Sequence, residues 1–248
     1  MEALIRLENI SMIYGNNGTR SIALRGLSLS IDAGEYVVIS GESGAGKSTL
    51  LTILGGLQVP TSGRVAINGV DLSTLSADGL ADFRRETIGF VFQAYHLLPY
   101  LSARENVMVP MSPLRASARE KAERADALLA SVGLAEKEER LPSELSGGEC
   151  QRVAIARSLV HDPPVLLADE PTGNLDSYTG EQILDLFTEL HRRGKTVLMV
   201  THNRANLSRA TRSVRLRDGA VADDENVLAP RCGASTWRRE PPTDTLPY

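Results

Sequence analysis

The segment 41–49, Gly-Glu-Ser-Gly-Ala-Gly-Lys-Ser-Thr, constrains this chain more than any other feature. It fits the pattern G-x-x-x-x-G-K-[ST] in full. It lies between a β-branched run at 36–39, which predicts a buried strand, and a segment at 47–55 that predicts a helix. Glycines let backbone N–H groups approach phosphate oxygens, and a helix N-terminus adds free donors and partial positive charge. Lys47 is expected to contact the β- and γ-phosphates of a nucleotide, and the Ser48 hydroxyl to coordinate Mg²⁺. The predicted nucleotide-binding residues of the loop are Gly41, Ser43, Gly44, Ala45, Gly46, Lys47, Ser48 and Thr49.

Two adjacent carboxylates follow a second buried strand. The apolar run at 165–168 ends at Asp169 and Glu170, and open α/β sheets bind ligands at the carboxyl ends of their strands. Asp169 is predicted to hold Mg²⁺, directly or through water. Glu170 is predicted to orient or deprotonate the water that attacks the γ-phosphate. An Asp-Glu pair before Pro171 could alone be a solvated turn, but the phosphate loop in the same chain favours the catalytic interpretation.

Composition bounds the remaining possibilities. The chain has 248 residues and a formal net charge of −4, so bulk charge gives no reason to expect nucleic-acid binding. We find no apolar run of the roughly 20 residues that a membrane-spanning helix needs, and the first residues do not resemble a secretory signal. Any membrane role is therefore expected to come through a partner chain. The two cysteines, Cys150 and Cys232, lack metal-type spacing and indicate a reduced, cytosolic protein.

The hydrophobic pattern alternates between strands and helices, which predicts an α/β fold with a largely parallel sheet. The segment 94–164 is predicted to be a helical insertion, and 229–248 a flexible tail. Asn68-Gly69 predicts a hairpin turn after a strand at 63–67, and Asp218-Gly219 a second turn between small strands. Further strands are predicted at 4–14, 22–31, 36–39, 88–92, 165–168 and 196–200, and helices at 47–55, 102–135, 147–160 and 178–193.

A second Gly-rich helix start makes the chain resemble one family in particular. Leu145-Ser146-Gly147-Gly148-Glu149, followed by Gln151-Arg152, resembles the signature motif of ATP-binding cassette (ABC) ATPases. The resemblance covers about residues 4–219. It implies a P-loop NTPase core with a mainly parallel sheet, a small antiparallel β subdomain and an inserted α-helical subdomain, with the ATP-binding domain over 1–228. Further matches occur in the family's order at Tyr14, Gln93, Asn174-Leu175-Asp176 and His202.

The resemblance also implies roles for these residues. Two identical or similar ATPase subunits would pair head-to-tail, each ATP lying between the phosphate loop of one and the signature motif of the other. Tyr14 would stack on adenine, Gln93 would reach Mg²⁺ and the attacking water, and His202 would contact the γ-phosphate. The implied contacts to the partner's side of the site come from Ser146, Gly147, Gly148, Glu149 and Asp176.

Each of these side chains has a plain structural alternative. Tyr14 could be a core or surface aromatic, Gln93 a polar strand cap and His202 a structural histidine. Ser146 could be a helix N-cap that forms a capping box with Glu149, which is compatible with the functional role.

Two positions depart from the family. Glu149 stands where Gln is usual and is expected to place negative charge near a phosphate site, with lower ATP affinity or slower closure. Asn203 replaces the Asp that often follows the switch histidine. Neither change touches the predicted hydrolysing residues. Cys150, next to Glu149, could be a small buried side chain or a redox-sensitive thiol.

Four segments resemble the lipoprotein-release and macrolide-export branch of the family: 89–93, 95–99, 105–107 and 171–177. That branch implies export, lipoprotein release or mechanotransmission through integral membrane permease subunits. They would be contacted by residues 93–110 at the cytoplasmic face of the inner or plasma membrane. Apolar residues at 94–101 fit such docking, although they could also pack under the helical subdomain. The alternatives left open are an importer ATPase for a small nutrient such as an amino acid, and a soluble ABC ATPase acting on ribosomes or DNA.

Overall fold

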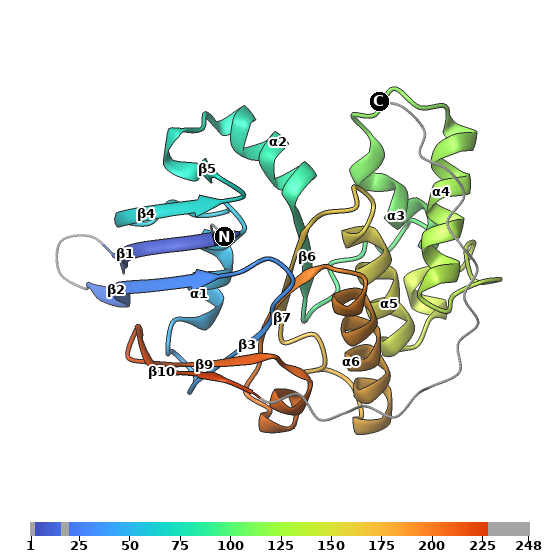
Figure 1. The fold of residues 1–248 in the computed structure, drawn as a ribbon. Coiled ribbons are helices and arrows are strands. Elements are labelled where there is room, and N and C mark those ends of the chain that lie inside the picture. The colour runs from blue at the N-terminus through green and yellow to red at the C-terminus, as the bar shows by residue number, and fades with distance from the viewer. Residues whose placement is uncertain (1–2, 16–19, 228–248) are drawn as a thin grey trace.

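The computed structural model describes residues 3–15 and 20–227, so the predicted tail at 229–248 lies outside the described residues. Two sheets and a group of helices make up the described part (Figure 1). An antiparallel sheet has the strand order β2-β1-β4-β5, and a six-stranded sheet the order β10-β9-β3-β8-β7-β6. The strands are β1 Ile5–Tyr14, β2 Ser21–Ile31, β3 Tyr36–Ser40, β4 Ser62–Ile67, β5 Val70–Asp71, β6 Ile88–Phe92, β7 Val165–Asp169, β8 Thr196–Val200, β9 Arg212–Arg217 and β10 Ala220–Asn226.

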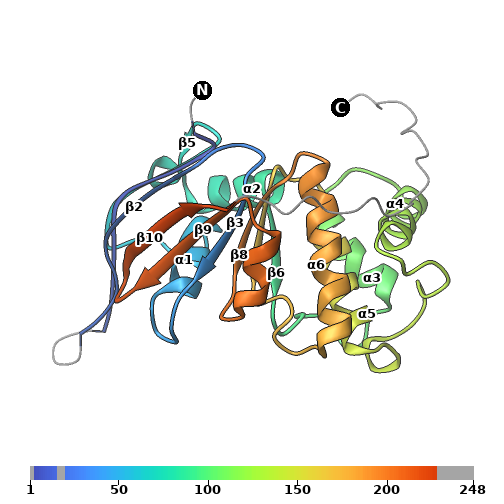
Figure 2. The ribbon, with the colours of Figure 1, turned by 60° about the horizontal axis from the view of Figure 1, so that its bottom comes forward.

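The six-stranded sheet is parallel except at β10, as the alternation of strands and helices predicted. The helices that accompany it are α1 Lys47–Leu54, α2 Ala77–Thr87, α3 Ala103–Met108, α4 Ala118–Ser131, α5 Gly147–Ser158 and α6 Ser177–Arg192. Both views place the antiparallel sheet and α1 on one side of the central strands, with α3, α4, α5 and α6 on the other (Figures 1 and 2).

Strand β3 contributes to two hydrophobic cores because its side chains alternate between the faces of the sheet. Val37 and Ile39 pack with α1 and the antiparallel sheet. Tyr36 and Val38 pack with the helices on the opposite side. All four are fully buried, and each apolar side chain of this kind contributes about 1.5–3 kcal/mol on burial. The strand before the phosphate loop is therefore held from both faces.

Both predicted hairpin turns are confirmed. Asn68 and Gly69 have φ of 51° and 75°, and Asp218 and Gly219 have φ of 51° and 80°. Two consecutive residues with positive φ are the requirement of the type I′ turn that joins twisted antiparallel strands. The first turn joins β4 to β5 and the second joins β9 to β10.

One expectation about the helices was wrong, and one helix was not predicted. The helix predicted over 102–135 is two helices, α3 and α4, because Pro110 and Pro113 lie between them and a proline cannot donate to an α-helical backbone. Ser117 then starts α4 with a capping box. Helix α2 was not predicted. Its residues are mostly polar, and Ser76 begins it by accepting a hydrogen bond from the Gly79 N–H.

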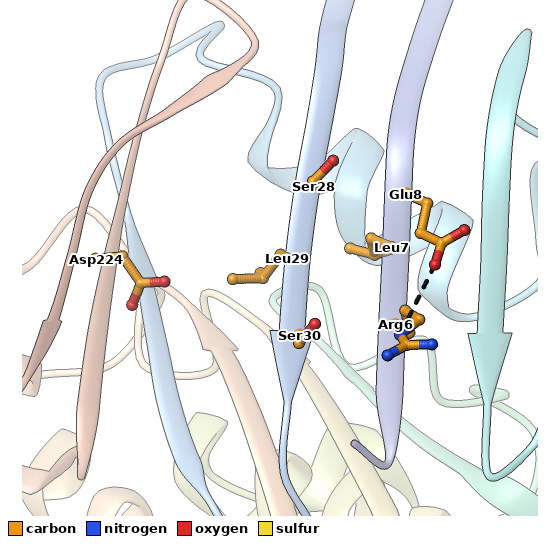
Figure 3. A pocket seen from close by; sticks show the side chains of 7 residues that line it. All are labelled: Arg6, Leu7, Glu8, Ser28, Leu29, Ser30 and Asp224. Carbon is orange, nitrogen blue, oxygen red and sulfur yellow. Dashed lines mark ion pairs between the residues drawn. The ribbon is translucent and has the colours of Figure 1, made fainter. Parts of the chain in front are cut away.

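A pocket of about 410 Å³ lies where β1, β2 and β10 come together (Figure 3). Its lining mixes apolar side chains with an Arg6–Glu8 ion pair and the carboxylate of Asp224. Arg212 in β9 donates to both oxygens of Asp224 and holds the pKa of that carboxyl below its usual range. None of the predicted site residues lines this pocket, so it is a feature of the sheet junction.

Candidate functional site

The carboxyl ends of four parallel strands meet at one edge of the sheet and bring most predicted catalytic residues together. Phe92 pairs with Asp169, Asp169 pairs with Val200, and Val200 pairs with Ile39. The residues that follow these strand ends therefore converge. They are Gly41 and the rest of the phosphate loop, Gln93, Glu170 and His202.

The phosphate loop leaves the start of α1 open. Its N-cap is Gly46, with φ of 97° and no side-chain cap, whereas Ser or Asp side chains cap α2 to α6. A Cβ at Gly46 would collide with the carbonyl oxygen of Ala23 in β2, so glycine is required here for space as well as for φ. The first-turn N–H groups of α1 are thus available to an anion.

Lys47 lies folded against its own loop. Its Nζ donates to the carbonyl oxygens of Gly41 and Glu42, both at 2.8 Å, and the residue is only 8% exposed. The loop therefore holds the ammonium beside the open helix start. An anion bound there would face the backbone N–H groups and a nearly desolvated positive charge together.

Ser48 and Asp169 form the oxygen pair that the sequence predicted for Mg²⁺. The Ser48 hydroxyl donates to Oδ1 of Asp169 at 3.3 Å. Burial raises the pKa of Asp169 and the nearby Glu170 charge adds to this, while Ser48 and Lys47 oppose it. A divalent cation bound here would offset the cost of keeping the buried Asp169 carboxylate charged. The described residues hold no cluster of three or more His, Cys, Asp or Glu side chains suited to a metal. One hydroxyl and one carboxylate fit Mg²⁺ that completes its shell with phosphate and water oxygens.

Glu170 and His202 are directly paired. Nδ1 of His202 lies 2.6 Å from Oε2 of Glu170. Glu170 has φ of 47°, and its backbone N–H donates to the Val200 carbonyl at 3.0 Å, so its position is fixed by the neighbouring strand β8. The side chain of His202 is 67% exposed and that of Glu170 21% exposed. This carboxylate–imidazole pair lies at the same edge of the sheet as the phosphate loop.

Gln93 is held by the turn that follows β7. Its Nε2 donates to Oδ1 of Asn174 at 3.2 Å, and Nδ2 of Asn174 donates to the Gln93 carbonyl at 3.1 Å. A Cβ at Gly173 would lie 2.7 Å from Nε2 of Gln93, so a larger residue there would displace the amide of Gln93. The same stretch ends at Asp176, whose side chain caps α6 by accepting from the Thr179 N–H at 3.0 Å.

The second Gly-rich helix start begins α5 with a capping box between Ser146 and Glu149. The Ser146 hydroxyl accepts from the Glu149 N–H, and Glu149 accepts from the Ser146 N–H. These bonds leave the first-turn N–H groups of Gly147 and Gly148 for another acceptor. In both views α5 lies on the helical side of the sheet and α1 on the other (Figures 1 and 2). Within the described residues, the hydrogen bonds and close contacts of Ser146, Gly147, Gly148 and Glu149 do not reach the phosphate loop.

The model of a family described as ABC transporter matches residues 24–173, which is more than half of the chain. This chain belongs to the ABC transporter family. The matched part is that family's ATP-binding, ATP-hydrolysing domain.

Named relatives and solved structures agree with this assignment. The chain is 49% identical over 219 residues to a lipoprotein-releasing system ATP-binding protein, LolD, of Syntrophus aciditrophicus, covering 88% of this chain and 98% of that protein. It is 48% identical over 221 residues to a macrolide export ATP-binding/permease protein, MacB, of Hyphomonas neptunium. That alignment covers 89% of this chain but 34% of the relative, so the chain spans about a third of the length of the macrolide-export proteins that it matches.

A solved structure of similar fold is a dimeric post-hydrolysis state of the ATP-binding cassette MJ0796, bound to ADP and Pi. Its TM-score is 0.83 at 42% identity, over 90% of this chain and 98% of that one. The predicted P-loop NTPase fold and membership of the ABC ATPase family are confirmed.

Tyr14 is the last residue of β1, and it lies close to helix α1. Its hydroxyl donates to Oε1 of Gln58 at 2.6 Å and lies 3.4 Å from Oγ1 of Thr49. The residue is 37% exposed, so its ring borders the phosphate loop without being a core side chain. Gln58 was missed in the sequence because it lies outside any motif.

The charge of Glu149, the departure from the usual signature motif of ABC ATPases, is paired within the chain. Glu149 forms an ion pair with Lys137, and this ammonium together with the Ser146 N–H holds the pKa of Glu149 below its usual range. Because Lys137 neutralises part of its charge, Glu149 would repel a nearby phosphate less than a free carboxylate would. The expected effect on ATP affinity stays a prediction.

Cys150 is buried, with its Sγ 3.6 Å from the Pro142 carbonyl oxygen, and burial raises the pKa of its thiol. These facts favour the packing interpretation over a reactive thiol. Cys232 lies outside the described residues.

No helix in the described ranges of this ABC domain has both the length and the apolar composition needed to cross a bilayer.

Proposed function

We propose that this chain binds Mg²⁺ATP at the phosphate loop and hydrolyses it only when a second copy, or a similar subunit, supplies its signature helix. The observation that carries the proposal is the separation of two open helix starts. α1 and α5 both present first-turn N–H groups, but they lie on opposite sides of the central sheet. One nucleotide would meet both only in a head-to-tail dimer. The dimeric MJ0796 cassette, of similar fold, supports this arrangement.

Within each site the residues would divide the work. Lys47 and the loop N–H groups would bind the β- and γ-phosphates, and Ser48, Asp169 and Gln93 would surround Mg²⁺. Glu170 would accept the proton of the attacking water while His202 holds its carboxylate in place. The metal would neutralise charge on the phosphate oxygens.

Across the dimer, the γ-phosphate of the partner's nucleotide would be covered by Ser146, Gly147, Gly148 and Glu149. Asp176 would contact the partner's side of the same site. Tyr14 would stack on adenine.

Mixing two inactive variants tests the head-to-tail arrangement. Lys47→Ala damages the phosphate loop, and Ser146→Arg blocks the signature helix start with a bulky cation. Each alone is expected to lose ATP turnover about 100-fold or more. In an equimolar mixture half of the dimers are mixed and each of these has one intact site, so turnover should recover to about a quarter of the wild-type rate.

A second mixture controls for nonspecific recovery. Lys47→Ala mixed with Glu170→Gln carries both defects on the phosphate-loop half of the site, so no intact site forms and turnover should stay absent. If the first mixture is no more active than its components, the head-to-tail arrangement is contradicted.

For the cellular role, we propose that the domain drives integral membrane permease subunits at the cytoplasmic face of the membrane, for export, lipoprotein release or mechanotransmission. The names of the LolD and MacB relatives support this branch. The docking region proposed at 93–110 includes three exposed apolar side chains: Leu98 at 47%, Tyr100 at 91% and Val109 at 40%. Large apolar side chains this exposed are typical of interaction surfaces.

Co-purification with a membrane subunit tests this role. Wild-type protein should be recovered with an integral membrane chain from detergent-solubilised membranes. Tyr100→Ser should reduce the recovery at least about fivefold, because aromatic anchors carry much of an interface's affinity. Val59→Ser is the matched control, since Val59 is 69% exposed but lies outside 93–110. Equal loss in both variants would contradict docking through this region.

A further inference from the structure

The loop that follows Gln93 has an unfavourable backbone. Tyr95 and His96 are consecutive non-glycine residues with φ of 58° and 49°. β-Carbon atoms disfavour this left-handed region, so two such residues in a row need support from outside the loop. The loop directly follows the predicted hydrolytic residue Gln93 and lies within the proposed docking region, 93–110, so its shape matters to both.

Arg157 in α5 supplies that support. Its Nη1 donates to the His96 carbonyl at 2.6 Å and its Nη2 donates to the Tyr95 carbonyl at 2.7 Å. One guanidinium therefore bonds both carbonyls of the left-handed pair. It forms no ion pair with any described carboxylate, and burial lowers its pKa. The planar fork of Arg suits two adjacent acceptors, whereas the ammonium of Lys does not.

Two further contacts tie the loop to the same helix. Gln151, fully buried in α5, places its Nε2 3.4 Å from the Phe92 carbonyl at the end of β6. At the start of α5, a Cβ on Gly147 would lie 3.0 Å from the Tyr95 hydroxyl, so the ring rests against the signature motif. The loop is thus attached to α5 from the motif to a point about three helical turns further on.

We propose that Arg157 is a positioning residue that fixes the Gln93 loop to the signature helix, so that the two move as one body. The inference rests on the proposed function, because it matters only if α5 engages the partner's nucleotide and Gln93 the chain's own. Closure of the signature motif on a nucleotide would then displace the docking region directly. Loss of the fork would free Tyr95 and His96 to leave the left-handed region and carry Gln93 out of place.

Arg157→Lys tests this with two measurements. The kcat for ATP should fall about tenfold while KM stays within about twofold, because the phosphate loop is untouched. In the nucleotide-free protein, amide hydrogen exchange at 94–98 should accelerate about tenfold, a readout that needs no hydrolysis. Arg157→Gln, which keeps N–H donors without the fork, is the second variant and should behave alike.

Arg124→Lys is the matched control. Arg124 is in α4, and its guanidinium donates to a backbone carbonyl, that of Val160, away from the loop, so exchange at 94–98 and kcat should stay within about twofold of wild type. Adding His96→Gly to Arg157→Lys should restore at least half of the kcat that Arg157→Lys loses, because glycine adopts positive φ without support.

The inference is overturned if Arg157→Lys leaves both measurements within twofold of wild type, or if Arg124→Lys has the same effect. It is also overturned if His96→Gly gives no rescue. Failure of the proposed function is distinguishable, because the wild-type protein itself would then lack ATP turnover while the exchange experiment still reports on the loop.

Discussion

Glu170→Gln is expected to reduce ATP turnover by about 10²–10⁴-fold, the usual contribution of a general base, while leaving ATP binding intact. The amide keeps the shape of the carboxylate and can still bond to His202, whose Nδ1 lies 2.6 Å from Glu170 in the wild type. It cannot accept the proton of the attacking water. With Mg²⁺ATP the variant should therefore accumulate as a dimer, measured by size-exclusion chromatography with light scattering beside a turnover assay.

Glu189→Gln provides the comparison for Glu170→Gln. Glu189 is a carboxylate in α6 that pairs with Arg193 at the surface, so neither turnover nor the dimer fraction should change. Full turnover in Glu170→Gln would show that another group activates the water, and the assignment of the general base would be wrong.

Lys47→Ala is expected to weaken ATP binding at least about tenfold and to abolish measurable hydrolysis. Lys47 is only 8% exposed, and its ammonium bonds to the carbonyls of Gly41 and Glu42. Charge-assisted hydrogen bonds of this kind contribute about 1.5–3 kcal/mol each. Its removal takes positive charge from the phosphates and also frees the loop that it holds closed. Titration calorimetry with ATP and Mg²⁺ measures the first effect, and a turnover assay the second.

Lys195→Ala is the control that distinguishes the specific role of Lys47 in ATP binding from a general loss of positive charge. Lys195 pairs with Asp162 away from the phosphate loop, so its removal should leave ATP affinity within about twofold. Wild-type affinity in Lys47→Ala would place the phosphates elsewhere and contradict the assignment of the loop.

Much of the fold and the candidate site was accessible from sequence because its signals are local. The phosphate loop, the acidic pair after β7 and the two hairpin turns each lie within a few consecutive residues, and each needs particular residue types for steric or electrostatic reasons. The central strands were predicted for the same reason, since burial on both faces requires an unbroken apolar run. The prediction failed at α2, whose polar residues have weak apolar periodicity, and across 102–135, where Pro110 and Pro113 interrupt the helical pattern.

The amino-acid sequence by itself determined the candidate chemistry: a phosphate loop, a candidate metal-binding acid, a candidate base and a second open helix start, since short motifs carry their own backbone requirements. Tertiary structure alone decided that the two helix starts lie on opposite sides of one sheet, that Lys137 pairs with Glu149, and that Arg157 holds Tyr95 and His96. These facts depend on contacts between residues far apart in the chain or on the register of parallel strands. No local pattern encodes such contacts, because they form only when the separate elements pack together.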